Sequence, residues 1–413
     1  MARESADWQG ARSWRACELM LRALDSPCRK GALIMKVKLY SVLLLVASLG
    51  FLLFASNVLA AQPNAALLKA KQDAETKGYI FETSHDEIVA KAKKEGRLKV
   101  LTGLDPASHA PMMQSFKKKY PFIESVEIHE LDNTDASQRF LSELKSGRGR
   151  EWDVAYLSTE VFSDYPPLAK KFDFLGMAEQ AVLKIPPKMV EPKYRTIVAL
   201  GSTISVAAYN KNLISAERVP NRWEDFLKPE FKGKKFLVEV IPYPFAAFPA
   251  CPEEGLGLEW ALKLARGLRD QDPIWIRGNT RALTAMAAGE YALHFATHYQ
   301  SVVRAMGKDP TGALQTRIIA PVPVRLTELK MVLNTAAHPY AGLLFIEHEA
   351  SPEGQAIIDK YGPLKGSLFV PGSALAKAVE GKKLCVSGFD EHGNNKKWMA
   401  MAVEAFGFPN AGK

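Results

Sequence analysis

The sequence has few cysteines and no long run of charges of one sign. Only four of its 413 residues are cysteine, too few for a scaffold held together mainly by disulfides. Its 54 Lys and Arg residues and 45 Asp and Glu residues are interleaved, so the net charge of +9 is a weak argument for nucleic acid, and no such partner is expected. With 47% hydrophobic and 24% charged residues, the composition excludes disorder as the main state.

The common signatures of catalytic sites are also missing. The chain contains no phosphate-binding loop, no G-x-G-x-x-G after a strand, no H-E-x-x-H, no G-x-S-x-G and no C-x-x-C. Two acid and histidine clusters, Glu347 to Glu349 and Asp390 to His392, are expected to lie on solvated helix or loop surfaces. No catalytic residue is predicted, and we do not expect an enzyme.

The N-terminal part carries the pattern of a secretion signal. Lys36 and Lys38 precede an apolar stretch over residues 42–55, and Val58-Leu59-Ala60 forms an A-x-A-like cleavage site. A permanent membrane anchor is the alternative, since residues 42–61 just reach the roughly 20 residues that a spanning helix needs. Residues 35–60 are therefore predicted to be a signal peptide, and residues 1–34 an upstream extension with no recognisable element. In an oxidising compartment Cys251 and Cys385 are free to pair, which the sequence does not decide.

The rest of the chain alternates between short apolar strands and amphipathic helices. A capping box at Ser84 to Glu87 predicts a helix that ends at Glu95. Strands and helices are then expected in turn, with strands at 98–102, 125–131 and 153–157 and helices at 108–120 and 135–145. This order predicts an α/β fold with a parallel sheet and right-handed crossovers.

Two stretches are predicted to pass between two lobes. Residues 196–210 form a long β-branched run that leaves one sheet and enters another. Residues 318–324 form a second run, whose two prolines favour an extended connection over a central strand. The expected organisation is an N-terminal helical lead-in over 61–95, the first part of lobe 1 over 96–200, lobe 2 over 201–317, and a return to lobe 1 with C-terminal helices over 318–413.

Polar segments at strand or helix ends are the candidate ligand-binding positions. Short hydroxyl side chains and free backbone N–H groups at such ends bind anions, although they also serve as ordinary helix caps. Those selected are Thr102, Gly103, Asp105, Ser158, Thr159, Ser202, Thr203, Asn279 and Thr280.

Three more candidates follow strands of the second lobe. His298 and Tyr299 come just past a strand expected at 292–296, where open α/β sheets bind ligands, whereas His294 is expected to pack in the core. Tyr243 directly follows the strand expected at 235–240 and is a candidate wall for an aromatic or cationic solute.

As an ordered set, several segments resemble type II periplasmic solute-binding proteins of ABC importers, and most of all the ferric-ion-binding cluster. They are EIVAKAKKEGRLKVLTG, KSGRGREWDVAYLST, VAAYNKNLI, NRWEDFLKPEFKGK, LTAMAAGEYALHFATHY and SPEGQAIIDKYG. The resemblance covers roughly residues 86–373. It implies two α/β lobes, each a sheet flanked by helices, which close on a ligand held in the cleft between them. It also implies a periplasmic monomer that delivers its ligand to an ABC permease and its ATPase.

The resemblance also bears on the ligand. Ferric members hold iron chiefly with two consecutive tyrosines, which match His298 and Tyr299, so only one tyrosine is kept. Their further histidine and glutamate match positions near Asp105 and near Ser158 or Thr159. We therefore expect a small organic or anionic solute, with Fe(III), held by His298 and Tyr299, as the alternative and no resident cofactor. A secreted enzyme or a sensor that uses the same two-lobed clamp is the alternative of another class.

Overall fold

The computed structural model describes residues 65–131, 134–156, 158–362 and 364–408. The predicted signal peptide and the stretch before it lie outside the described residues. Within the described ranges, no helix is both long and apolar enough to cross a bilayer.

The first lobe is built from the alternating strands and helices that the sequence predicts. Strand β1 (Arg97–Thr102) pairs in parallel with β2 (Ser125–Glu130) and β3 (Val154–Tyr156). Helices α4 (His85–Glu95), α5 (His109–Lys119) and α6 (Thr134–Lys145) alternate with these strands along the chain. The Ser84 hydroxyl accepts a hydrogen bond from the Glu87 amide and so caps α4 as predicted. Apolar side chains from α4, α5 and the three strands fill one core.

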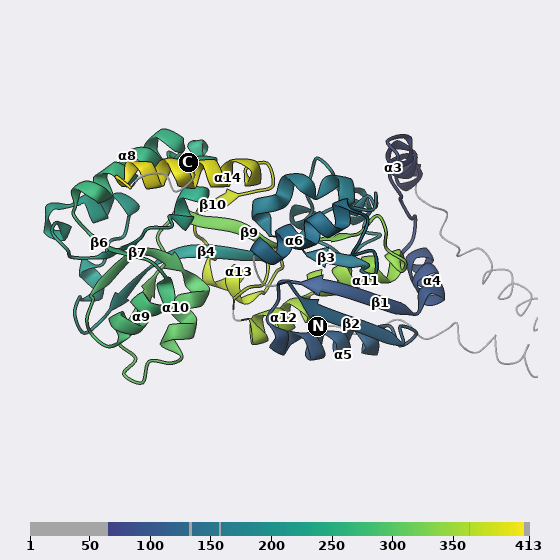
Figure 1. The fold of residues 1–413 in the computed structure, drawn as a ribbon, viewed down its shortest axis with the longest axis horizontal. Coiled ribbons are helices and arrows are strands. Elements are labelled where there is room, and N and C mark those ends of the chain that lie inside the picture. The colour runs from purple at the N-terminus through teal and green to yellow at the C-terminus, as the bar shows by residue number, and fades with distance from the viewer. Residues whose placement is uncertain (1–64, 132–133, 157, 363, 409–413) are drawn as a thin grey trace, which may run out of the picture. The chain divides into compact units, whose positions relative to one another are not determined.

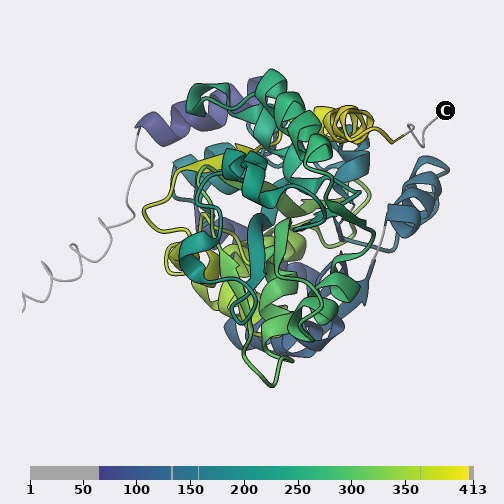
Figure 2. The same cartoon turned by 90° about the vertical axis from the view of Figure 1, so that its left-hand side faces the viewer.

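The second lobe repeats this arrangement with shorter strands. Strand β5 (Leu237–Glu239) pairs in parallel with β6 (Ile274–Ile276) and β7 (Leu293–His298). Helix α8 (Leu258–Asp270) lies on one side of this sheet, and α9 (Asn279–Ala287) and α10 (Tyr299–Met306) lie on the other (Figures 1 and 2). His294 is fully buried in β7, which confirms its expected place in the core.

Two long antiparallel strands run through both lobes. They are β4 (Val198–Asn210) and β9 (Val322–Val332), and the sheet order is β2-β1-β3-β9-β4-β7-β5-β6. β9 pairs with β3 on the first-lobe side, while β4 pairs with β7 and β8 (Leu314–Arg317) on the second-lobe side. Figure 1 shows β4 and β9 lying between the strands of the two lobes. The crossing predicted over 196–210 is confirmed.

The prediction that 318–324 is only an extended connection is wrong. Its last three residues, Val322 to Val324, begin the central strand β9 and also pair with β10 (Leu384–Ser387). Pairing of β9 with β4 ends at Val324 opposite Ile204, and Val322 donates its amide on the other side, to the Lys383 carbonyl. Amide directions alternate along a strand, so the nitrogen of Pro323 faces the β4 side. Pairing with β4 has already ended there, so the missing N–H of Pro323 costs no hydrogen bond of the sheet.

The expectation that residues 347–349 are solvated is also wrong. Helix α11 (Pro339–Ala350) packs against α4, β1 and β9, and every residue from Ala341 to Ala350 is buried. Burial is tolerated because the two carboxylates have partners: Glu347 binds the His85 ring and the Lys184 amide, and Glu349 pairs with Lys330. Helix α12 (Pro352–Tyr361) follows, and the Ser351 hydroxyl caps it by accepting from the Gly354 amide.

The C-terminal segment touches both lobes. Helix α14 (His392–Ala405) contacts α8 and the short helix η8 (Tyr243–Ala246) of the second lobe, and η2 (Thr159–Asp164) of the first. Its first residue, His392, is buried against Phe162 rather than solvated, which corrects that expectation for the histidine. A disulfide joins Cys251 to Cys385 on β10 and decides the pairing that the sequence left open.

Candidate functional site

The predicted residues at the end of β1 mainly make hydrogen bonds within the loop that follows the strand. The buried Thr102 hydroxyl accepts from the Leu104 amide at 3.2 Å. The Asp105 carboxylate accepts from the Ala107 amide at 3.0 Å and so caps a short helix. Gly103 allows a close approach, since a Cβ there would lie 2.7 Å from the Tyr156 ring. Thr102 and Asp105 therefore make local hydrogen bonds of the capping kind, which are the alternative to ligand binding that the sequence leaves open.

Arg325, on the crossing strand β9, lies close to residues of both lobes. Its Nη2 atom lies 3.4 Å from the Thr159 hydroxyl, which belongs to the first lobe. Its guanidinium carbon lies 5.8 Å from the centre of the Tyr243 ring, which belongs to the second lobe. A planar guanidinium presents several N–H donors that suit carboxylate and phosphate groups. The structure thus places two predicted residues, Thr159 and Tyr243, around a cation that sequence reasoning missed.

His298 extends this group at the end of β7. The Tyr243 and His298 rings meet edge to face, with centres 4.4 Å apart. Burial, helped by the positive charge of Arg325, lowers the pKa of His298 to about 4, so the imidazole is neutral at pH 7. Its buried Nε2 atom has no hydrogen-bond partner among the described residues. We name Arg325, Tyr243, His298 and Thr159 the crossing-strand site.

Gln300 ties the start of α10 to the crossing strand β4. Its side-chain nitrogen lies 3.1 Å from the Ser202 carbonyl, 3.0 Å from the Thr203 hydroxyl and 2.9 Å from the Leu364 carbonyl. The Ser202 hydroxyl in turn accepts from the Leu368 amide. Ser202 and Thr203 therefore anchor the helix that carries Tyr299. Thr203 is also the residue of β4 that pairs with Arg325 of β9, so it lies beside the crossing-strand site.

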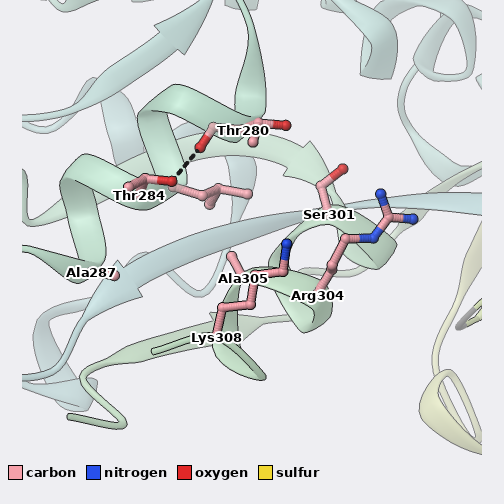
Figure 3. Close-up of a pocket in the computed structure, with 8 residues that line it drawn as sticks. Thr280, Thr284, Ala287, Ser301, Arg304, Ala305 and Lys308 are labelled. Carbon is pink, nitrogen blue, oxygen red and sulfur yellow. Dashed lines mark hydrogen bonds between the residues drawn. The ribbon is translucent and has the colours of Figure 1, made fainter. Parts of the chain in front are cut away.

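The remaining predicted residues make contacts outside the group around Arg325. The Ser158 amide donates to the Ser137 hydroxyl, and the half-buried Tyr299 packs against an apolar cluster of the second lobe. Asn279 accepts from the Thr297 hydroxyl at 2.9 Å. Thr280 lines a surface pocket of about 250 Å³ between α9 and α10, together with Thr284, Ser301, Arg304 and Lys308 (Figure 3). This pocket contains no residue of the crossing-strand site.

The donor set for a metal is incomplete in the part of the chain that the structure covers. No group of three or more His, Cys, Asp or Glu side chains able to hold a metal ion occurs among the described residues. His298 and Tyr299 are adjacent in sequence, but Asp105 is engaged in capping its own helix.

Sequence reasoning missed Arg325, Gln300 and the nearby Glu328. Arg325 and Glu328 carry a detectable signal, because they are charged residues, like Lys330, inside the mainly apolar run VPVRLTELKMV. Treating 318–324 as a connection hid that run. Gln300 gives no comparable signal, since a glutamine in the first turn of a helix is common on protein surfaces.

Comparisons with known proteins bear on both fold and family. The family profile described as bacterial extracellular solute-binding protein matches residues 156–395. A comparison with curated protein sequences finds no match.

Several solved structures share the fold. Iron-bound HitA from Pseudomonas aeruginosa is 16% identical, with a TM-score of 0.55 over 75% of this chain and 99% of that one. The Trichodesmium protein IdiA (FutA), in complex with iron and citrate, is 16% identical, with a TM-score of 0.58 over the same shares. The substrate-binding protein of an ABC transporter from Agrobacterium tumefaciens is 17% identical, with a TM-score of 0.55 over 75% of this chain and 94% of that one.

These likenesses confirm the predicted fold, the two-lobed α/β fold of type II periplasmic binding proteins. The profile match spans more than half of the sequence and includes the whole of lobe 2. The chain therefore belongs to the family of bacterial extracellular solute-binding proteins.

Proposed function

We propose that this protein is the periplasmic receptor of an ABC importer and captures a small anionic solute between its two lobes. The carrying observation is Arg325, which lies on a strand common to both lobes and reaches Thr159 of one and Tyr243 of the other. A ligand drives closure only if it binds the closed state better, so it must touch both lobes. The crossing-strand site offers such contacts.

The chemistry around Arg325 favours an anion over a cation. A guanidinium forms charge-assisted hydrogen bonds with carboxylates and phosphates, and these are stronger than neutral ones. Neutral His298 adds a ring nitrogen without a second positive charge. The Tyr243 ring adds an apolar wall. The proposal includes delivery of the solute to a membrane permease and its ATPase, and the solute-binding family supports this role.

Fe(III) is the second candidate ligand. It is favoured by the iron-bound HitA and IdiA structures, which share the fold. His298 and Tyr299 would be its donors here, with a phenolate oxygen suited to a hard cation. The absence of a three-residue donor group among the described residues weighs against this candidate.

Thermal unfolding of the purified protein tests the proposal. The panel contains small carboxylates, phosphonates and Fe(III)-citrate. A ligand at 100 times its Kd should stabilise the protein by about 2.7 kcal/mol. Arg325→Gln should weaken anion binding at least about tenfold, because it removes a charged hydrogen bond. Arg304→Gln, an exposed arginine in the pocket between α9 and α10, is the matched control and should bind normally.

Each result selects a different account. An Fe(III)-dependent shift with red colour, lost in Tyr299→Phe, would make iron the ligand. No shift with any member of the panel would contradict the receptor assignment and favour an enzyme or sensor.

A further inference from the structure

Glu328 is a buried carboxyl group held in an unusual backbone conformation. It lies on β9, is 7% exposed, and has a φ of +51°, in the left-handed region that a non-glycine residue rarely adopts inside a strand. Such a conformation persists only where the surroundings enforce it, and it occurs often at functional sites. The backbone conformation of Glu328 therefore indicates a functional role as well as a packing role.

Two glycines make room for this side chain. A Cβ added to Gly103 would lie 2.8 Å from the Glu328 Oε1 atom, and one added to Gly201 would lie 3.2 Å from its Cγ atom. Any larger residue at Gly103 would crowd both the carboxyl group and the Tyr156 ring. The space for Glu328 is thus built by neighbours on β4 and directly after β1.

The carboxyl group lies at the ligand-binding edge of the first lobe. Tyr156 opposite Lys330 is the last pair of β3 and β9 among the described residues. By this register Glu328 lies opposite Ser158, which is no longer in the strand. Gly103 follows the carboxyl end of β1, the parallel neighbour of β3. Open α/β sheets bind ligands just outside these ends. Arg325 is three residues from Glu328 on the same strand, at most about 10 Å along it.

One oxygen of Glu328 has no partner. The Oε2 atom is buried and makes no hydrogen bond within the described ranges. Lys330 is the nearest buried cation in the sequence, but its ammonium is engaged by Glu349. Burial raises the pKa of Glu328, and the charges of Lys330 and Lys365 oppose that rise. A buried acceptor without a donor needs an explanation, and a donor on a bound ligand is one.

We infer that Glu328 contacts the solute and selects one that carries a protonated amino group as well as its anionic group. The anion binds Arg325, and the amino group donates to the Glu328 Oε2 atom. The solute class is thus an amino-bearing acid. This inference rests on the proposed function, because it uses the same cleft and the same arginine.

Calorimetric titration with matched probes tests the inference. The probes are ω-amino acids of three to six carbons and the parent carboxylates without the amine. The wild-type protein should bind the best amino acid at least about tenfold more tightly than its parent, as expected for one charged hydrogen bond. Glu328→Gln keeps the shape and should remove this preference while still binding the parent acid. Arg325→Gln should lose both.

A second variant and a control keep the result interpretable. Gly103→Ala crowds the carboxyl group and the neighbouring Tyr156 ring without removing the charge of Glu328, and it should also reduce the preference. Glu290→Gln, an exposed glutamate between α9 and β7, should leave it unchanged. If Glu328→Gln does not fold, the Gly103→Ala result decides.

Three results would overturn the inference. Equal binding of amino acid and parent by the wild type, or an unchanged preference in both variants, would leave Glu328 a structural residue and the anion receptor intact. Binding of Fe(III)-citrate alone, with none of the acids, would overturn the anion receptor as well.

Discussion

Arg325 concentrates the chemistry of the site because of the strand that carries it. β9 pairs with the first-lobe strand β3 at one end, with β10 at the other, and with β4 along most of its length. A charge on such a strand interacts with a ligand from either lobe. The neighbouring His298 stays neutral because burial and this same charge lower its pKa to about 4.

Buried histidines should make the protein acid-sensitive. Full burial lowers the pKa of His294 to about 3, and neither ring nitrogen has a partner among the described residues. Its folded pKa is below the unfolded value of about 6.5, so its contribution to stability is present above that pH and is lost as pH falls. Between pH 7 and pH 5 the loss should be about 2 kcal/mol for this histidine.

Urea denaturation at the two pH values measures this loss. His294→Leu should flatten the pH dependence by that amount, whereas His129→Gln, on the exposed part of β2, should leave it unchanged. An equally steep dependence in His294→Leu would place the acid sensitivity elsewhere.

At the residue scale, the sequence predicts those site residues whose place is set by the end of a strand. The sequence predicts Tyr243 and His298 as site residues because they come at the ends of strands of the second lobe, and the structure brings their rings together. Asp105 also follows a strand, but its carboxylate accepts a hydrogen bond from the Ala107 amide and caps a short helix. Arg325 and Glu328 escape prediction because their importance depends on which strands β9 lies between.

At the element scale, local patterns predict most helices and strands. The helix capped by Ser84 and the strands of the first lobe follow from caps and apolar periodicity. β9 does not, because Pro323 is acceptable only at a position where the partner strand has ended. The buried charges of α11 escape for a similar reason: their partners Lys330, His85 and Lys184 come from distant parts of the chain.

The disulfide should stabilise the C-terminal segment. Cys251 and Cys385 are 134 residues apart and fix β10 to the second lobe. Closing a loop of this length restricts the unfolded chain, so the paired Cys251→Ala and Cys385→Ala substitutions should cost about 3–5 kcal/mol.

Urea denaturation with and without reductant measures the effect of the disulfide. The wild type should lose stability on reduction, and the double variant should be insensitive. A wild type that reductant does not affect would show that the bond contributes nothing to stability under these conditions.

At the scale of the whole molecule, the two-lobed fold was predictable from the order of its elements and from resemblance, and the family match agrees. The contacts between the lobes could not be predicted, because they join residues far apart in the sequence. Gln300 to Leu364 and Arg325 to Thr159 are examples. Such contacts set the balance between open and closed states, which a ligand shifts only through its difference in affinity for them.

Small-angle X-ray scattering with and without solute tests the central claim, that a small anion is captured between the lobes through Arg325. The solute is the panel member that stabilises the wild type most. The radius of gyration of the wild type should decrease when that solute is saturating, and Arg325→Gln should show no decrease at the same concentration. An unchanged radius in a wild type that demonstrably binds the solute, or an equal decrease in Arg325→Gln, would contradict the account.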